Sequence, residues 1–240
     1  MTEIAKQETA VDKALGADPG PLGLFAFAFT TLLLSMINVG VLTGAGVPIV
    51  IALALFWGGL SQMIAGAFEM RKGNTFGFTA FTSYGAFWLF FALVQIVGAL
   101  HIFTVDVPTL AWSLLFWGVF TLLMWIPAMM ANKVLNVVFL LLWITFFLLA
   151  GGAFLAVYGA AAVGGIVTQI GGGFGLLTAA AAMYGGLAGV MNSMGGHLPV
   201  GKGAGKGAKK AERVESTQAP EKVLERVTIV VDEQGTDEDR

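Results

Sequence analysis

The stretch TFGFTAFTSYGAFWLFFALVQIVGAL, residues 75–100, contains no charged side chain. The hydrocarbon core of a bilayer is about 30 Å thick, and a helix needs roughly 20 predominantly apolar residues to cross it. The length and composition of this stretch therefore predict a membrane-spanning helix. On that helix Thr75, Thr79 and Thr82 fall at positions i, i+4 and i+7, so their hydroxyls share one face.

Five other apolar segments are long enough to cross a bilayer. They are residues 22–43, 47–68, 108–131, 134–157 and 171–194. The composition agrees, because 57% of residues are hydrophobic and only 12% are charged, whereas a soluble domain carries about 25% charged residues. The predicted fold class is all-α, an integral membrane protein with six transmembrane helices.

Charge divides the chain into three parts. Residues 1–20 are predicted to be a cytoplasmic N-terminal tail, 21–194 the six-helix transport domain, and 195–240 a cytoplasmic C-terminal tail that is disordered. All 13 Lys and Arg residues lie in the tails or in the turns at 69–74 and 132–133. With six spans, this distribution places both termini in the cytoplasm by the positive-inside rule.

Polar side chains occur inside the first three spans, where lipid offers them no hydrogen-bond partner. The candidates for lining a path are Thr31, Asn38, Gln62, Thr79, Thr82 and Ser83. For a single Thr or Ser, a hydrogen bond to the carbonyl four residues earlier is the simpler interpretation. The amides of Asn38 and Gln62 cannot be satisfied so locally, and polar stripes on three consecutive helices favour a shared polar path.

Charged residues are absent from the middle of every span. Such a path suits a small, weakly hydrated or readily protonated solute better than a multivalent ion. Glu69 ends the second span beside Arg71 and Lys72, which favours a local salt bridge over a proton or anion gate at the entrance. With no cysteine and two isolated histidines, we expect no metal site and no cofactor. No catalytic motif and no nucleic-acid-binding face occurs, so we expect no enzyme.

Two blocks carry a family resemblance. DPGPLGL at 18–24 resembles the N-P-A-P-L-G-L signature of the acetate uptake transporter family, which includes the bacterial succinate–acetate permeases, and residues 72–89 are similar to that family's third-helix block. The residues that match or replace the signature are Asp18, Pro19, Pro21, Leu22, Gly23 and Leu24. Asp18 stands where the signature has Asn; Asp caps a helix as well as Asn does, but an ionised carboxylate at the mouth could repel an anion.

The resemblance implies a homo-hexamer in which each protomer has its own path for acetate and related small carboxylates, including succinate. It also implies a hydrophobic constriction formed by Phe27, Tyr84 and Leu142. Proton-coupled symport and an anion channel both remain open, so protons are a candidate co-substrate.

The hypothesis is therefore a transporter or channel for small carboxylates in the plasma membrane. One alternative is a channel for a neutral solute such as urea, another amide or ammonia, and another is a non-transporting membrane sensor or scaffold. Membrane lipids are expected partners, because a basic run in the C-terminal tail can rest on anionic headgroups or remain a solvated tail. That run consists of Lys202, Lys206, Lys209 and Lys210.

Overall fold

A computed structural model describes residues 16–204, and this part of the chain is helical without any strand. The elements are α2 (Gly20–Val39), η1 (Gly44–Gly46), α3 (Val47–Leu55), η2 (Phe56–Ser61), α4 (Gln62–Arg71), α5 (Thr75–Ala99), α6 (Val107–Ala131), α7 (Lys133–Val157) and α8 (Ala161–Ser193). They form six helices long and apolar enough to cross a membrane, η1 to α4 together making the second. Most of the two predicted tails lies outside the described residues.

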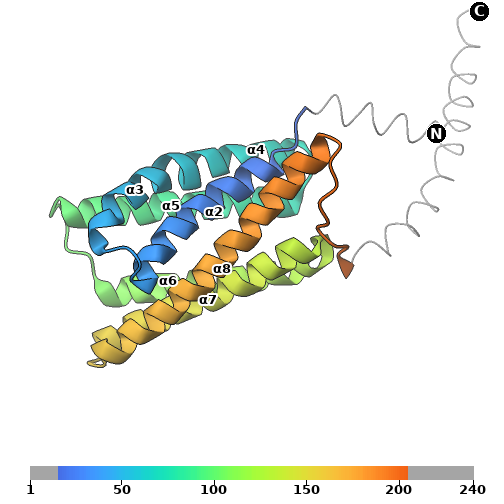
Figure 1. Cartoon of the computed structure of the whole chain (residues 1–240). Coiled ribbons are helices and arrows are strands. Elements are labelled where there is room, and N and C mark those ends of the chain that lie inside the picture. Colours follow the sequence, from blue (N-terminus) through green and yellow to red (C-terminus); the bar gives the residue numbers. More distant parts are fainter. Residues whose placement is uncertain (1–15, 205–240) are drawn as a thin grey trace, which may run out of the picture.

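The six spans run side by side in one bundle (Figure 1). The last helix, α8, packs against both α2 and α7, while α6 packs on α7 and α4 packs on α5 and α2. The described chain begins and ends at the same end of the bundle (Figure 1). An even number of spans requires this arrangement, and the side of the membrane on which that end lies stays a prediction.

The second span changes its winding halfway along. Residues Phe56–Ser61 form a π-helical turn between α3 and α4, and the hydroxyl of Ser61 donates to the carbonyl of Phe56 over 2.9 Å. A Cβ on Gly58 would lie 2.7 Å from Thr30 Oγ1 and 2.9 Å from the Trp88 ring. Only glycine lets this turn approach α2 and α5 so closely.

The sixth helix is longer than predicted. It begins at Ala161, ten residues before the expected start at residue 171, so residues 161–170, which lie between the fifth and sixth predicted spans, are helical. A Cβ on Gly152 of α7 would lie 2.8 Å from the carbonyl oxygen of Gly164 of α8. Close packing of two glycine-bearing helices stabilises this segment, which is rich in small residues.

Three helices begin with a side chain that caps their free N–H groups. Asn74 accepts from Gly77 at the start of α5, and Asn132 accepts from Leu135 at the start of α7. Asp106 caps α6, and hydrogen bonds from the hydroxyl and the backbone of Thr109 hold the pKa of Asp106 below its usual value.

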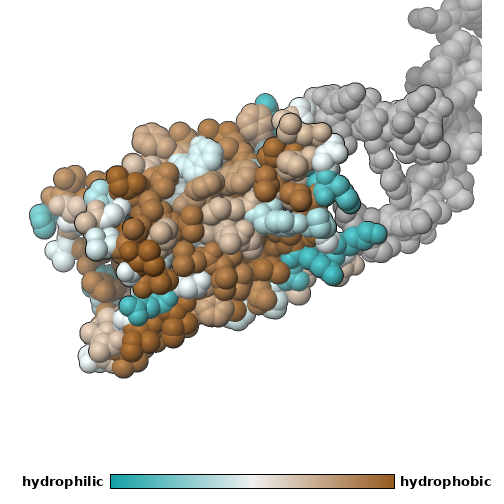
Figure 2. All heavy atoms as spheres, viewed as in Figure 1, coloured by the Kyte–Doolittle hydropathy of each residue, from teal (hydrophilic) through white to brown (hydrophobic). Residues whose placement is uncertain are grey.

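The surface pattern fits a membrane-embedded bundle. Figure 2 shows apolar side chains over the middle of the visible face, with hydrophilic ones gathered mainly at the end where the described chain begins and ends. Large apolar side chains such as Phe56 and Phe116, with 67% and 64% of their area exposed, point outward. In water these would be unfavourable, whereas lipid or a neighbouring protomer accommodates them.

The residues after α8 fold back onto the bundle. We call residues 195–204 the C-terminal strap. The amide of Asn192 donates to the carbonyl of Leu198 over 3.0 Å and accepts from the Leu198 N–H over 2.7 Å. The N–H of Val134 donates to the carbonyl of Val200 over 3.2 Å. These bonds join the end of α8 to the start of α7 and fix the course of the strap across that end of the bundle.

Candidate functional site

A cavity of about 460 Å³ penetrates the bundle from the end where the described chain begins and ends. Its outer wall is polar and includes Asp18, Lys72, Asn74, Asn132, Asn192 and Ser193. Its inner wall is formed mainly by buried apolar side chains, among them Phe27, Tyr84, Val138, Phe139 and Leu142. A solute entering it would pass from a wet, polar mouth to a dry, apolar interior.

The three predicted constriction residues meet at the inner wall. Phe27 comes from α2, Tyr84 from α5 and Leu142 from α7, and each has 6% or less of its area exposed. The rings of Phe27 and Tyr84 have their centroids 5.9 Å apart. Phe139, which we did not predict, also lies 5.9 Å from Tyr84, centroid to centroid. Three helices distant in sequence thus bring the three side chains to one cavity, and their role as a gate stays a prediction.

A short chain of hydroxyls holds Tyr84. Its hydroxyl lies 2.9 Å from Thr121 Oγ1 of α6, and that hydroxyl in turn donates to the carbonyl of Trp117 over 2.7 Å. Thr121 is completely buried. The sequence did not single out Thr121, because a lone Thr in an apolar span is ordinarily satisfied within its own helix.

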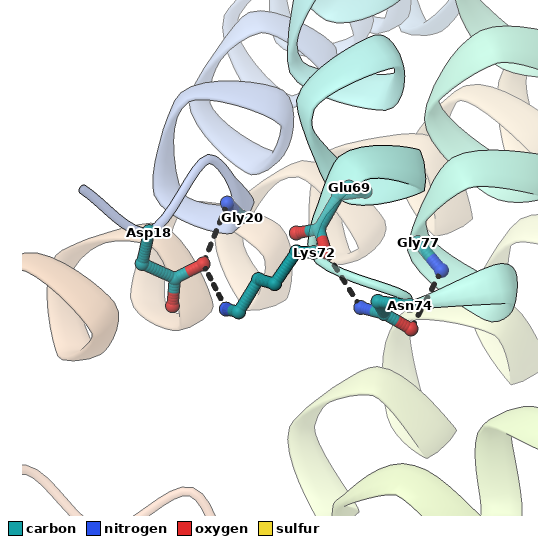
Figure 3. Close-up of polar contacts among 6 residues, drawn as sticks. All are labelled: Asp18, Gly20, Glu69, Lys72, Asn74 and Gly77. Carbon is teal, nitrogen blue, oxygen red and sulfur yellow. Dashed lines mark hydrogen bonds and ion pairs between the residues drawn. The ribbon is translucent and has the colours of Figure 1, made fainter. Parts of the chain in front are cut away.

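The mouth carries an ion pair. Asp18 Oδ1 lies 2.9 Å from the Lys72 ammonium and accepts from the Gly20 N–H over 3.0 Å (Figure 3). Asp18 thus accepts from the first residue of α2, although the N-cap position that we expected it to fill is occupied by Pro19. Its charge is compensated by Lys72, which weakens the repulsion that a lone carboxylate would exert on an entering anion.

Glu69 lies deeper than the ion pair. It has 2% of its area exposed, and its Oε2 accepts from the Asn74 amide over 2.7 Å. The same Asn74 caps α5 through its Oδ1, so it links the end of α4 to the start of α5 (Figure 3). The sequence favoured a local salt bridge for Glu69; the structure gives that carboxylate an amide donor and places the Lys72 ammonium on Asp18.

Three helices start at the mouth. Gly20 of α2, the α5 cap Asn74 and the α7 cap Asn132 all line the cavity. The N-terminus of a helix carries a partial positive charge and stabilises anions nearby. Asn74 and Asn132 were missed in the sequence, although an Asn directly before an apolar segment is a recognised helix-start signal.

Of the six predicted polar lining residues, Gln62 lies in the lining of this cavity, and it is 1% exposed with no hydrogen-bond partner for its Oε1. The other five are outside that lining. They are Thr31, Asn38, Thr79, Thr82 and Ser83. Thr82 lies against Gly66 of α4, so part of the hydroxyl face of α5 packs against a helix. Contact of these five with a solute stays a prediction.

The N-terminal motif divides in the same way. Asp18, Pro21 and Leu24 line the cavity. The remaining three do not, and these are Pro19, Leu22 and Gly23. A Cβ on Gly23 would lie 2.7 Å from the Phe81 ring, so this glycine serves packing between α2 and α5.

A family model described as the GPR1/FUN34/yaaH family matches residues 3–201. The chain belongs to the GPR1/FUN34/yaaH family. One relative is the succinate-acetate/proton symporter SatP of Escherichia coli (strain K12), 40% identical over 191 residues that cover 78% of this chain and 96% of that protein. Another is acetate permease A of Emericella nidulans, 41% identical over 187 residues, or 74% of this chain and 62% of that protein.

A solved structure of the bacterial acetate channel SatP matches with a TM-score of 0.69 and 39% identity, covering 77% of this chain and 99% of that one. The GPR1/FUN34/yaaH assignment confirms the resemblance read from residues 18–24 and 72–89. It also confirms the all-α fold with six spans. The chain is a multi-pass membrane protein, and these relatives are transporters or channels.

Among residues 16–204, no group of three His, Asp or Glu side chains is placed to hold a metal ion.

Proposed function

We propose that this protein carries acetate and related small carboxylates, including succinate, across the plasma membrane through the cavity of each protomer. The observation that carries the proposal is the cavity that joins three helix N-termini at its mouth to Phe27, Tyr84 and Leu142 at its inner wall. The names of the SatP relatives support the choice of acetate.

The two ends of the cavity have complementary effects on a carboxylate. Helix N-termini at the mouth favour a negative charge, and Lys72 offsets the repulsion from the Asp18 carboxylate there. The inner wall favours the methyl group of acetate and disfavours a bare carboxylate, because removing a charge from water without a partner is costly. A short monocarboxylic acid, which is small and loses its charge by taking up one proton, meets both requirements.

Proton coupling follows from the same argument. An acid that crosses the apolar wall in its protonated form moves one proton with each molecule, whereas a bare anion moves charge. We propose the protonated route, which agrees with the description of one SatP relative as a proton symporter. A channel for the anion is the competing mechanism.

We further propose a homo-hexamer with both termini in the cytoplasm. The exposed apolar side chains along the helices offer surface for neighbouring protomers as well as for lipid. Because the path lies within one protomer, each protomer is the transporting unit. The hexamer then serves to pack the protomers against one another in the membrane.

Uptake of labelled acetate into proteoliposomes tests the proposal. We expect acetate uptake to rise when the interior of the vesicles is made more alkaline than the outside solution. Leu142→Trp should block it by filling the constriction, while Leu177→Trp on the outer surface, where Leu177 is 58% exposed, should leave it intact. Folded protein that carries no acetate would refute the proposal.

The same vesicles separate the alternatives. Uptake that follows voltage and ignores the pH gradient would indicate an anion channel. Uptake of urea, other amides or ammonia with no acetate uptake would indicate a path for a neutral solute. Transport of none of these solutes by folded protein would favour a sensor or scaffold.

A further inference from the structure

The hydrogen bonds around Tyr84 have a fixed direction. A backbone carbonyl can only accept, so the Thr121 hydroxyl must donate its single proton to Trp117, 2.7 Å away. Thr121 Oγ1 can then only accept from Tyr84, 2.9 Å away. The phenolic proton of Tyr84 is therefore committed to α6.

This direction determines what the inner wall offers the carboxyl group of a solute. Phe27, Leu142 and Phe139 have no O–H or N–H in their side chains, and the single donor of Tyr84 is already used. A carboxyl group among these four side chains finds no hydrogen-bond donor from them. It recovers there none of the hydrogen bonds that it accepted from water, so these four side chains do not hold it in place.

Thr121 is well placed to keep this arrangement. It has no exposed area and lies on α6, which contributes no residue to the cavity lining. It therefore cannot act by touching the solute from the cavity. Tyr84 itself is held by ring contacts with Trp117, Phe120 and Phe139, at centroid distances of 6.3, 5.7 and 5.9 Å, which position the ring but do not direct its hydroxyl.

We propose that Thr121 is a positioning residue for transport: by accepting the Tyr84 hydroxyl, it keeps the phenolic donor at the constriction away from the carboxyl group of the solute. The inference rests on the proposed function. Without Thr121 Oγ1 the phenolic proton lacks its partner, and the carbonyl oxygen of the protonated acid in the path becomes its acceptor. An acid held by that hydrogen bond binds more tightly and leaves more slowly.

Thr121→Val tests this with little change in volume. We expect the KM for acetate to fall about 3- to 10-fold, the range that one hydrogen bond to an uncharged group, here the carbonyl oxygen of the protonated acid, supports, and the maximal rate to fall with it. Thr121→Ser, which retains the acceptor, should restore both values. A Thr121→Ser variant that behaves like Thr121→Val would overturn the role of the hydroxyl.

The Tyr84→Phe background supplies the matched control. Here no phenolic proton exists, so adding Thr121→Val should change neither KM nor maximal rate. If Thr121→Val has the same effect in both backgrounds, it acts through packing and the proposal is wrong.

Thermal unfolding in detergent tests the pairing without transport. Thr121→Val alone leaves a buried donor unsatisfied and should lower Tm; adding Tyr84→Phe removes that donor and should lower Tm no further. Additive losses of Tm would refute the pairing. Should the wild-type protein carry no acetate while this coupling is present, the proposed function and the transport role fail, and the hydrogen bond itself stands.

Discussion

The ammonium of Lys72 lies 2.9 Å from the carboxylate of Asp18, although 54 residues separate them in the chain. The pair joins the residues before α2 to the end of α4 at the cavity mouth. Both side chains are nearly half exposed, so its contribution to stability is small, about 0–1 kcal/mol. Its larger effect is on the electrostatic potential that an entering anion meets.

Removing only the cation should expose this effect. Lys72→Gln leaves the Asp18 carboxylate at the mouth, and we expect the KM for acetate to rise about two- to fivefold at low salt, with less change at high salt. The double variant Asp18→Asn with Lys72→Gln should return the KM toward the wild-type value. Initial uptake rates at two ionic strengths give the KM of the single and of the double variant. An equal rise in the double variant would contradict compensation by this pair.

Asn74 has two separable structural roles. Asn74→Ala loses the α5 cap and the Glu69 contact together, and the cap alone is worth about 1 kcal/mol. Asn74→Ser keeps a capping oxygen but is too short to replace the amide that Glu69 accepts. We expect Tm to fall in both variants and further in Asn74→Ala, as measured by thermal unfolding. Equal Tm values for the two would show that the cap contributes nothing measurable.

Adjacent glycines on α8 offer a matched pair for packing. A Cβ on Gly172 would lie 2.7 Å from the backbone nitrogen of Val39, which cannot move aside, whereas a Cβ on Gly173 would meet nothing within 4 Å. Gly172→Ala should therefore destabilise the protein by about 1–3 kcal/mol. Gly173→Ala should be neutral or stabilising by up to about 1 kcal/mol. Unfolding in detergent compares them, and similar stabilities would contradict close α2–α8 packing.

The size of Tyr84 should set the upper limit on the solute. Tyr84→Ala removes a ring that lies between Phe27 and Phe139, so we expect uptake of longer acids such as butyrate to rise relative to acetate. Tyr158→Ala, at a side chain with 75% of its area exposed, is the control. Competition by a series of unlabelled acids measures the substrate range, and an unchanged range would exclude Tyr84 as the selective element.

Two truncations separate the strap from the rest of the C-terminal tail. A chain ending at residue 204 retains every described contact of the strap and should transport acetate normally. A chain ending at Met194 loses the Asn192–Leu198 and Val134–Val200 bonds, and we expect a lower Tm. Normal Tm and transport in the shorter chain would show that the strap is dispensable.

Hydropathy predicted the spans well because lipid imposes one length and one composition on every helix that crosses it. It failed at residues 161–170, whose Gly and Ala residues are also typical of a connection, and the contact that stabilises the helix there is with Gly152 on the preceding helix, α7. A contact between two helices is not visible in a window of one segment.

The candidate site shows the same limit. The helical periodicity of residues 75–99 places Thr75, Thr79 and Thr82 on one face of α5. It does not indicate what that face contacts, and Thr82 lies against Gly66 of α4. Family resemblance selected Tyr84, because the third-helix block is long and distinctive. Neither source of information indicated Thr121, since its significance depends on which atom of another helix lies 2.9 Å away.

The strap is a covalently attached segment at the cavity mouth. Because Val200 lines the cavity and its carbonyl accepts from the N–H of Val134, residues 195–204 are held beside that mouth. A covalent attachment of this kind gives a short segment an effective local concentration on the order of millimolar. Any influence of these residues on anion entry would therefore vanish when they are supplied as a free peptide at micromolar concentration.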